Sequence, residues 1–199
     1  IISSLKSPPD KIQRIFSVAA EGHRNLCVGQ GDELILRKSK RIPSSREILD
    51  IFRNKTSPAF EVALRIGAIS GGGTLELCSI LKSYCVSLGI AYQIKDDIED
   101  FTSFSYANYE NKIYSSIIFS IIFENTDEKG RKELTNYTYG CLEEKDKLED
   151  LREFAHKYNA IEKATCLCEH YKNEAIRSLI PVQNPQLKSF LRRIIGKML

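Results

Sequence analysis

The stretch from Thr74 to Asp100 constrains the fold of this 199-residue chain more than any other feature. Apolar residues recur in it at intervals of three and four positions, which is the period of an α-helix with one buried face. These residues are Leu75, Cys78, Leu81, Cys85, Leu88 and Tyr92. A helix of about 27 residues is about 40 Å long, so other elements must cover its apolar face along that length.

The other segments with a clear hydrophobic pattern are predicted to be helical as well. The same period predicts helices over 11–36, 44–52, 58–70, 111–123, 129–146, 149–156, 160–178 and 186–198. The sequence contains no period-2 strand pattern, no internal repeat and no low-complexity tract. We therefore predict an all-α bundle of about eight helices, formed by residues 1–199 as a single helical domain.

Short signals mark where several of these helices begin and end. Ser44 or Ser45 can cap the second helix, and Pro58 stands in the first turn of the third. The glycines at 71–73 end that third helix. Gly89 lies inside the long apolar helix, where a glycine costs up to about 1 kcal/mol relative to alanine. A glycine at that position indicates close packing against another element.

Composition argues against several classes of protein. With 42% hydrophobic and 28% charged residues, the chain can bury one sizeable core, and its net charge of +3 is too small to indicate a nucleic-acid binder. The six cysteines form no C-x-x-C pair and no zinc-finger spacing with histidine, so a reducing, cytoplasmic location is expected. The least polar segment, 113–123, is shorter than the roughly 20 residues of a membrane span, and the N-terminal residues do not resemble a signal peptide.

Three aspartates follow the long apolar stretch, in the sequence Y-Q-I-K-D-D-I-E-D at 92–100. Helix geometry of about 100° per residue places four polar residues within an arc of about 100° and turns Glu99 away from them. The four are Gln93, Asp96, Asp97 and Asp100. Like charges at these spacings destabilise a helix by a few tenths of a kcal/mol per pair, and the helix dipole disfavours them near a C-terminus.

A bound cation would remove both effects. Oxygen ligands without a nearby histidine or cysteine indicate Mg²⁺, with Mn²⁺ as a substitute. Mg²⁺ typically takes one or two carboxylates together with substrate phosphates. From the spacing alone, a solvated helix end that binds nothing is an equal alternative.

The aspartate motif and its surroundings resemble the trans-isoprenyl diphosphate synthases, also called the polyprenyl synthetase family. The resemblance depends on Y-Q-I-K-D-D-I-E-D at the end of an apolar helix, on K-T at 55 and 56, and on G-Q-G-D at 29–32. It covers the C-terminal part of that family and nearly all of this chain. It implies an isoprenoid-synthase-like helical bundle around a deep central cavity, in which two aspartate-rich motifs face each other and hold Mg²⁺ ions.

The resemblance also implies which residues bind the metal. Asp96, Asp97 and Asp100 match the second aspartate-rich motif of the family. Asp96 is the expected direct ligand and, with Lys55, an expected catalytic residue.

Four other residues match positions that contact the substrate diphosphate. Lys55 and Thr56 match a K-T pair whose ammonium and hydroxyl bind it, and Gln93 matches a polar residue one turn before the aspartates. Lys112 occupies roughly the place of a later diphosphate-contacting lysine.

The activity implied by the resemblance is a prenyl transfer. A Mg²⁺-dependent prenyltransferase of this family ionises an allylic diphosphate and joins the resulting carbocation to isopentenyl diphosphate. The main tasks of such a site are to neutralise the leaving group and to exclude water. Because members of the family are usually dimeric, a homodimer is expected, with neither nucleic acid nor a membrane span as partner.

The sequence also departs from the family pattern. The first aspartate-rich motif and the residues that help to bind isopentenyl diphosphate are absent from these 199 residues, and 101–111 lacks the expected glycine-lysine segment. We therefore expect this chain alone to be inactive. One alternative is a non-catalytic partner subunit of a heteromeric prenyl synthase. A terpene cyclase is a further alternative. Phe104 argues against it, because a cyclase needs a polar ligand at that position.

Overall fold

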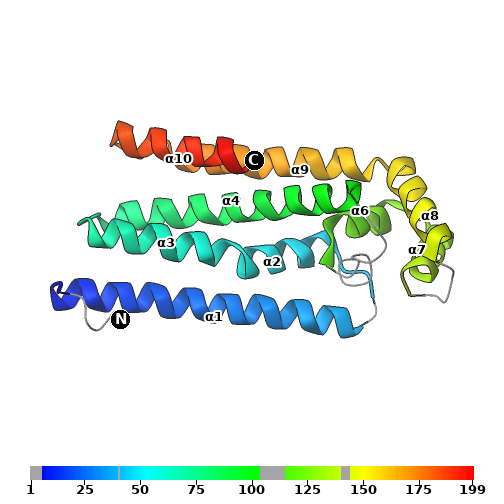
Figure 1. Ribbon diagram of the computed structural model, residues 1–199, viewed down its shortest axis with the longest axis horizontal. Helices are drawn as coiled ribbons and strands as arrows, with labels where there is room; N and C mark the ends of the chain where they lie inside the picture. Colours follow the sequence, from blue (N-terminus) through cyan, green and yellow to red (C-terminus); the bar gives the residue numbers. More distant parts are fainter. Residues whose placement is uncertain (1–5, 40, 104–114, 140–143) are drawn as a thin grey trace.

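The fold is a bundle of α-helices, shown in Figure 1. The computed structural model describes residues 6–39, 41–103, 115–139 and 144–199, with the side chains of 137–139 and 144–148 left out. Its helices are α1 (Pro9–Ser39), α2 (Ser45–Lys55), α3 (Ser57–Ser70), α4 (Leu75–Thr102), α6 (Ile117–Asn125), α7 (Glu128–Tyr139), α8 (Glu144–Lys157), α9 (Ala160–Ser178) and α10 (Pro185–Met198). The described residues contain no strand, so the predicted all-α class is confirmed.

The long helices lie side by side, and α4 lies inside the bundle. In Figure 1, α2 and α3 follow one another end to end in a single row between α1 and α4. Helix α1 packs on both α2 and α3, while α4 packs on α3 and, most extensively, on α9. Helices α6, α7 and α8 gather at the end of the bundle where α4 ends. The junction between α2 and α3 therefore lies between the middle of α1 and the C-terminal half of α4.

Helix α4 forms much of the core. Its cysteines Cys78 and Cys85 are buried free thiols, as expected of small core residues. The hydroxyl of the fully buried Tyr84 donates to the carbonyl of Leu191 at 2.9 Å, which connects α4 to α10. By length and composition α4 could also cross a membrane, but half of its most apolar window is buried against neighbouring helices, which fits a core helix.

Two of the apolar positions expected in the buried stripe of α4 are exposed. Leu75 is 74% exposed because it is the first residue of the helix, at the end of the bundle. Tyr92 is 37% exposed, and its ring contacts the edge of Phe60 with centroids 6.1 Å apart. The periodicity identified the helix correctly, but the neighbouring helices determine how much of its stripe they cover.

The helix-start signals of the sequence are present as hydrogen bonds. The Ser44 side chain accepts from the backbone N–H of Glu47, and the Glu47 carboxylate accepts from that of Ser44, which is a capping box. A second cap of α2 comes from a distant residue, because Glu124 at the end of α6 accepts from both the backbone N–H and the hydroxyl of Ser45 at 2.7 Å. After α3, Gly72 adopts a φ of +81°, which favours glycine.

Two predicted helices have different bounds in the structure. The helix expected over 129–146 corresponds to α7, which ends at Tyr139, and to the start of α8 at Glu144; the residues between them lie outside the described residues. The helix expected over 111–123 corresponds to α6, which begins at Ile117 after its N-cap Ser116, and residues 111–114 lie outside the described residues.

Candidate functional site

The junction between α2 and α3 is held between two glycines. Lys55 ends α2, and Thr56 separates it from α3. A Cβ added at Gly29 of α1 would lie 2.5 Å from the backbone nitrogen of Lys55, and one added at Gly89 of α4 would lie 2.7 Å from the Cα of Ser57. Both separations are shorter than real Cβ contacts, so only glycine permits α1 and α4 to approach the junction this closely. The close packing predicted at Gly89 is confirmed.

The Lys55 ammonium is held by a buried carboxylate of α1. Its Nζ lies 2.8 and 2.9 Å from the two carboxylate oxygens of Glu33, a residue that is only 3% exposed. Arg37 and Gln30 also donate to Glu33, at 3.2 and 3.0 Å. Burial alone would raise the pKa of Glu33, but Lys55 and Arg37 outweigh burial and hold that pKa below its usual value.

Sequence reasoning missed Glu33, although it directly follows the G-Q-G-D stretch. Glu33 lies four residues after Gly29 and three before the buried Leu36, so the three residues share the inner face of α1. An acidic residue on an otherwise buried face needs a cationic partner, and Lys55 is a cation of the same family motif. This helical spacing was the signal that could have identified Glu33.

A second set of hydrogen bonds joins the junction to α4. The hydroxyl of Thr56 donates to Oε1 of Gln93 at 2.9 Å, and Nε2 of Gln93 donates to Oδ2 of Asp96 at 3.3 Å. Lys55 and Thr56 are neighbours in sequence, so α1, the junction and α4 are connected from Glu33 to Asp96. All of these side chains except Glu33 are partly exposed, which leaves them accessible to a ligand.

The aspartates of α4 do not have the same surroundings. Asp96 contacts Gln93, whereas Oδ2 of Asp97 accepts the backbone N–H of Ile117 at 2.7 Å, at the start of α6. Burial raises the pKa of Asp97 to about 7, although its hydrogen bonds with Ile117 and Ser116 act in the opposite direction. Lys112, which was also predicted to contact a ligand, lies outside the described residues.

The neighbouring glutamate behaves as helix geometry predicted. The Glu99 side chain is 66% exposed and lies 3.6 Å from the Lys95 ammonium, which also donates to the carbonyl of Met198 at 3.0 Å. Within the described part of the chain, the Glu99 side chain makes no hydrogen bond or ion pair with Gln93, Asp96 or the K-T pair. It therefore offers a control carboxylate close to the site.

The donor set fits Mg²⁺ bound together with a phosphate ligand. Across the part of the chain that the structure describes, no three His, Cys, Asp or Glu side chains are grouped so as to hold a metal ion by themselves. Asp96 and Asp100 stand one turn apart on α4 and are both partly exposed. Mg²⁺ needs only one or two carboxylates when waters and substrate phosphates complete its octahedron, so this pair is sufficient on the protein's side.

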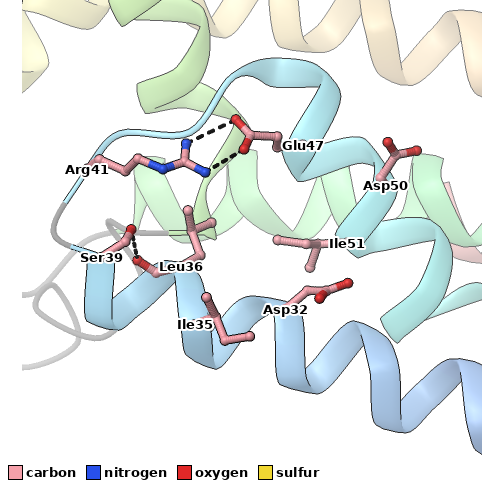
Figure 2. Close-up of a pocket in the computed structure, with 8 residues that line it drawn as sticks. All are labelled: Asp32, Ile35, Leu36, Ser39, Arg41, Glu47, Asp50 and Ile51. Carbon is pink, nitrogen blue, oxygen red and sulfur yellow. Dashed lines mark hydrogen bonds and ion pairs between the residues drawn. The ribbon is translucent and has the colours of Figure 1, made fainter.

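A pocket lies beside this region, between the end of α1 and the start of α2 (Figure 2). Its volume is about 270 Å³, and Leu36 and Ile51 line it together with Asp32. Arg41 donates to the Glu47 carboxylate across it, and this contact lowers the pKa of Glu47 to about 2. None of the predicted site residues lines this pocket.

The raised pKa of Asp97 predicts a dependence of stability on pH. A pKa of about 7 in the folded protein, against about 3.9 in an unfolded chain, means that the folded state binds more protons between these values. The contribution of Asp97 to stability is therefore present below about pH 4 and is lost as the pH rises toward 7. Asp97→Asn removes this effect, so in metal-free buffer its Tm should rise relative to wild type by about 5 °C or more between pH 4 and pH 8.

The measurement is a series of thermal melts of both proteins across that pH range. Glu99→Gln is the control, because it removes an exposed carboxylate from the same helix. A difference in Tm between Asp97→Asn and wild type that does not change with pH would contradict this assignment.

Comparisons with known proteins find relatives with matching sequence and fold. The family model of the polyprenyl synthetases matches residues 1–156. Geranylgeranyl diphosphate synthase of Methanosarcina mazei is 29% identical over 103 residues, which are 52% of this chain and 32% of that protein. A crystal structure of geranylgeranyl pyrophosphate synthetase from Pyrococcus horikoshii superposes with a TM-score of 0.87 at 23% identity, over 99% of this chain and 61% of that one.

A second solved structure was determined with ligands. It is geranylgeranyl pyrophosphate synthase from Corynebacterium glutamicum in complex with isoprenyl diphosphate and magnesium, with a TM-score of 0.83 at 15% identity, over 96% of this chain and 56% of that one. At these identities the two structures show the same helical fold. The chain spans about a third of the length of the Methanosarcina relative. Because the family model matches more than half of its residues, the chain belongs to the polyprenyl synthetase family.

Proposed function

We propose that this chain forms the allylic-diphosphate-binding part of a prenyl diphosphate synthase, which condenses that substrate with isopentenyl diphosphate. The observation that carries the proposal is the connected set of polar side chains at the α2–α3 junction. This set joins Lys55 and Thr56 to Gln93 and Asp96. The hydrogen bond between Thr56 and Gln93 connects residues that are 37 positions apart in the sequence. The family and the magnesium in the Corynebacterium complex support it.

Each side chain of the set suits one part of a diphosphate. An ammonium has three N–H donors, and Glu33 takes at most two of those on Lys55, so at least one remains for a phosphate oxygen. The Thr56 hydroxyl, which donates to Gln93, and Nε2 of Gln93, which donates to Asp96, can each donate to the same phosphate ligand instead. Positive charge and donors placed before the reaction stabilise the pyrophosphate that leaves.

Asp96 is proposed to hold Mg²⁺, or Mn²⁺ in its place, together with at least one further aspartate of the motif. When bound, the metal would neutralise the charge of the diphosphate and so make it a better leaving group. Buried Glu33 serves a different purpose, because it fixes the direction of the Lys55 ammonium without contacting the substrate. The cytoplasmic location, the homodimer and the inactivity of this chain by itself remain predictions.

Replacing Lys55 tests the proposal. In the protein at its full natural length, Lys55→Gln removes one charged hydrogen bond to the ligand, worth about 1.5–3 kcal/mol. The Mg²⁺-dependent affinity for pyrophosphate, measured by calorimetric titration, should therefore fall about tenfold to a hundredfold. Arg37 still pairs with Glu33, so the variant is expected to remain folded.

Lys82→Gln is the matched control for this test. Lys82 also lies against a glutamate, with Nζ 2.6 Å from Glu21, and its replacement changes the net charge equally. It belongs to the first half of α4, far from the K-T pair, so the affinity should not change. An equal loss in both variants would attribute the effect to overall charge and contradict a specific site at Lys55.

A non-catalytic partner subunit is the alternative that the site itself leaves open. The first aspartate-rich motif of the family pattern is absent from these 199 residues, so in an active enzyme that motif must come from elsewhere. A protein at its full natural length that binds Mg²⁺ and pyrophosphate but does not elongate an allylic diphosphate would favour this alternative.

A further inference from the structure

The N-terminus of α6 lies in the core, where its backbone N–H groups need partners. Ile117 and Ile118, its first two residues, are fully buried, and Phe119 after them is buried as well. The first N–H groups of any α-helix have no partner within the helix. In a buried position water cannot satisfy them, and an unpaired N–H is costly there.

Two side chains satisfy these groups. The Ser116 hydroxyl oxygen accepts the N–H of Ile118 at 3.2 Å, and Oδ2 of Asp97 accepts the N–H of Ile117 at 2.7 Å. Ser116 also hydrogen-bonds to the Asp97 carboxylate through its side chain, so the hydroxyl donates to Asp97 while it accepts from Ile118. Serine is a common local cap, but Asp97 comes from a different helix, 20 positions earlier.

This contact gives one aspartate of the motif a structural partner that is not a cation. The N-terminus of a helix carries a partial positive charge that favours an anion. Asp97 is turned toward that end of α6, whereas Asp96 contacts Gln93. Asp96 and Asp100 of the motif lie one helical turn apart on α4, and both are partly exposed.

Helix α6 in turn connects the aspartates to the K-T pair. Its other end carries Glu124, which caps the start of α2 through Ser45. Helix α2 ends at Lys55, and Thr56 next to it returns to α4 through Gln93. Helices α4, α6 and α2 are thus joined in a closed series of contacts around the candidate site. The buried apolar side chains of α2, of α6 and of α4 from Ile90 onward belong to one cluster.

We propose that Asp97 is a positioning residue that anchors the N-terminus of α6 to the acidic end of α4, and that Asp96 and Asp100 alone of the three aspartates bind the metal. The first half of this inference depends only on the hydrogen bonds of Asp97. The second half rests on the proposed function. The two halves are tested by separate measurements on the same variants.

The anchor is tested without metal, in the protein at its full natural length. Asp97→Ala leaves the N–H of Ile117 unpaired, so at about pH 4 hydrogen exchange of the amides of 117–125 should accelerate and Tm should fall by about 5 °C or more. Asp97→Asn keeps an oxygen acceptor of the same size, so it should restore slow exchange in 117–125. Asp96→Ala is the matched control, since it deletes the neighbouring carboxylate without touching α6.

Unchanged exchange of 117–125 in Asp97→Ala would overturn the anchor. Equally fast exchange in Asp97→Asn and Asp97→Ala would overturn it too, because the amide oxygen would then fail to replace the carboxylate. These comparisons need no diphosphate ligand, so they decide the anchor whatever the protein binds.

The metal ligands are tested by calorimetric titration with Mg²⁺ and pyrophosphate. Asp97→Asn should stay within about threefold of the wild-type affinity, whereas Asp96→Asn and Asp100→Asn should each lose about tenfold or more. A loss in Asp97→Asn as large as that in Asp96→Asn would make Asp97 a metal ligand and overturn the second half. If the wild type itself does not bind pyrophosphate with Mg²⁺, the proposed function fails, and the exchange result for the anchor still stands.

Discussion

Asp96→Asn is expected to lower the Mg²⁺-dependent affinity for pyrophosphate about tenfold to a hundredfold, because it removes a charged oxygen ligand and keeps the size of the side chain. Asp96 is partly exposed and receives only a 3.3 Å hydrogen bond from Gln93, so its carboxylate can bind a ligand without disrupting a buried contact. Calorimetric titration of the protein at its full natural length with pyrophosphate, with and without Mg²⁺, measures the change.

Glu99→Gln is the matched control for Asp96→Asn. It removes the same charge within one turn of the same helix, but the Glu99 side chain is 66% exposed and lies beside Lys95. The affinity should therefore stay at the wild-type value. In metal-free buffer, Asp96→Asn should leave Tm unchanged or raise it slightly, since relief of repulsion with Asp100 is worth only a few tenths of a kcal/mol.

Two outcomes would contradict this account of the aspartates. An equal loss of affinity in Asp96→Asn and Glu99→Gln would show that the face of the helix does not matter. No loss in either variant would mean that the aspartates only end a solvated helix, which was the alternative drawn from the sequence.

Gly29→Ala is expected to destabilise the protein strongly. The added Cβ would lie 2.5 Å from the backbone nitrogen of Lys55 and 2.6 Å from the carbonyl carbon of Asn54. Backbone atoms cannot turn away as a flexible side chain can, so α1 and α2 must separate. Overpacking of this kind costs about 1–3 kcal/mol or more, and thermal melting should show a Tm lower by about 5 °C or more.

Gly31→Ala is a control in the same helix, only two residues away. A Cβ at Gly31 meets nothing within 4 Å, so the change only removes the helix-weakening effect of a glycine. It should raise stability by up to about 1 kcal/mol. A similar fall in Tm for both variants would mean that the close approach of α1 to Lys55 is not the cause.

Gly29→Ala should also weaken ligand binding, which connects this prediction to the site. Separation of α1 from α2 moves Glu33 away from Lys55, and the ammonium loses its fixed direction. The Mg²⁺-dependent affinity for pyrophosphate should therefore fall at temperatures where the variant is still folded, whereas Gly31→Ala should bind as the wild type does.

The sequence by itself determined the class of the fold and most of its helices. Apolar spacing of three and four residues predicted α4 and its buried Cys78 and Cys85. A serine cap predicted the start of α2, and Pro58 predicted the start of α3. Gly89 indicated close packing before any neighbour was known. These features depend on residues within about four positions of one another, so the chain carries them without its tertiary structure.

Sequence reasoning also identified most of the candidate site, partly from the residues and partly from a family resemblance. The structure brings the predicted Lys55, Thr56, Gln93 and Asp96 together by direct contacts or through their neighbours. Helix geometry correctly separated Glu99 from them. Helical spacing alone did not distinguish the roles of Asp96, Asp97 and Asp100 from one another.

Only the tertiary structure decided what the individual side chains contact. Lys55 meets Glu33 across 22 positions, and Asp97 meets Ile117 across 20, both between different helices. Such contacts depend on which helix packs on which and at what height, and that is set by burial summed over the whole bundle. Helical period places a residue on a face, but the neighbour opposite that face determines whether a carboxylate holds a lysine, caps a helix or remains open to a ligand.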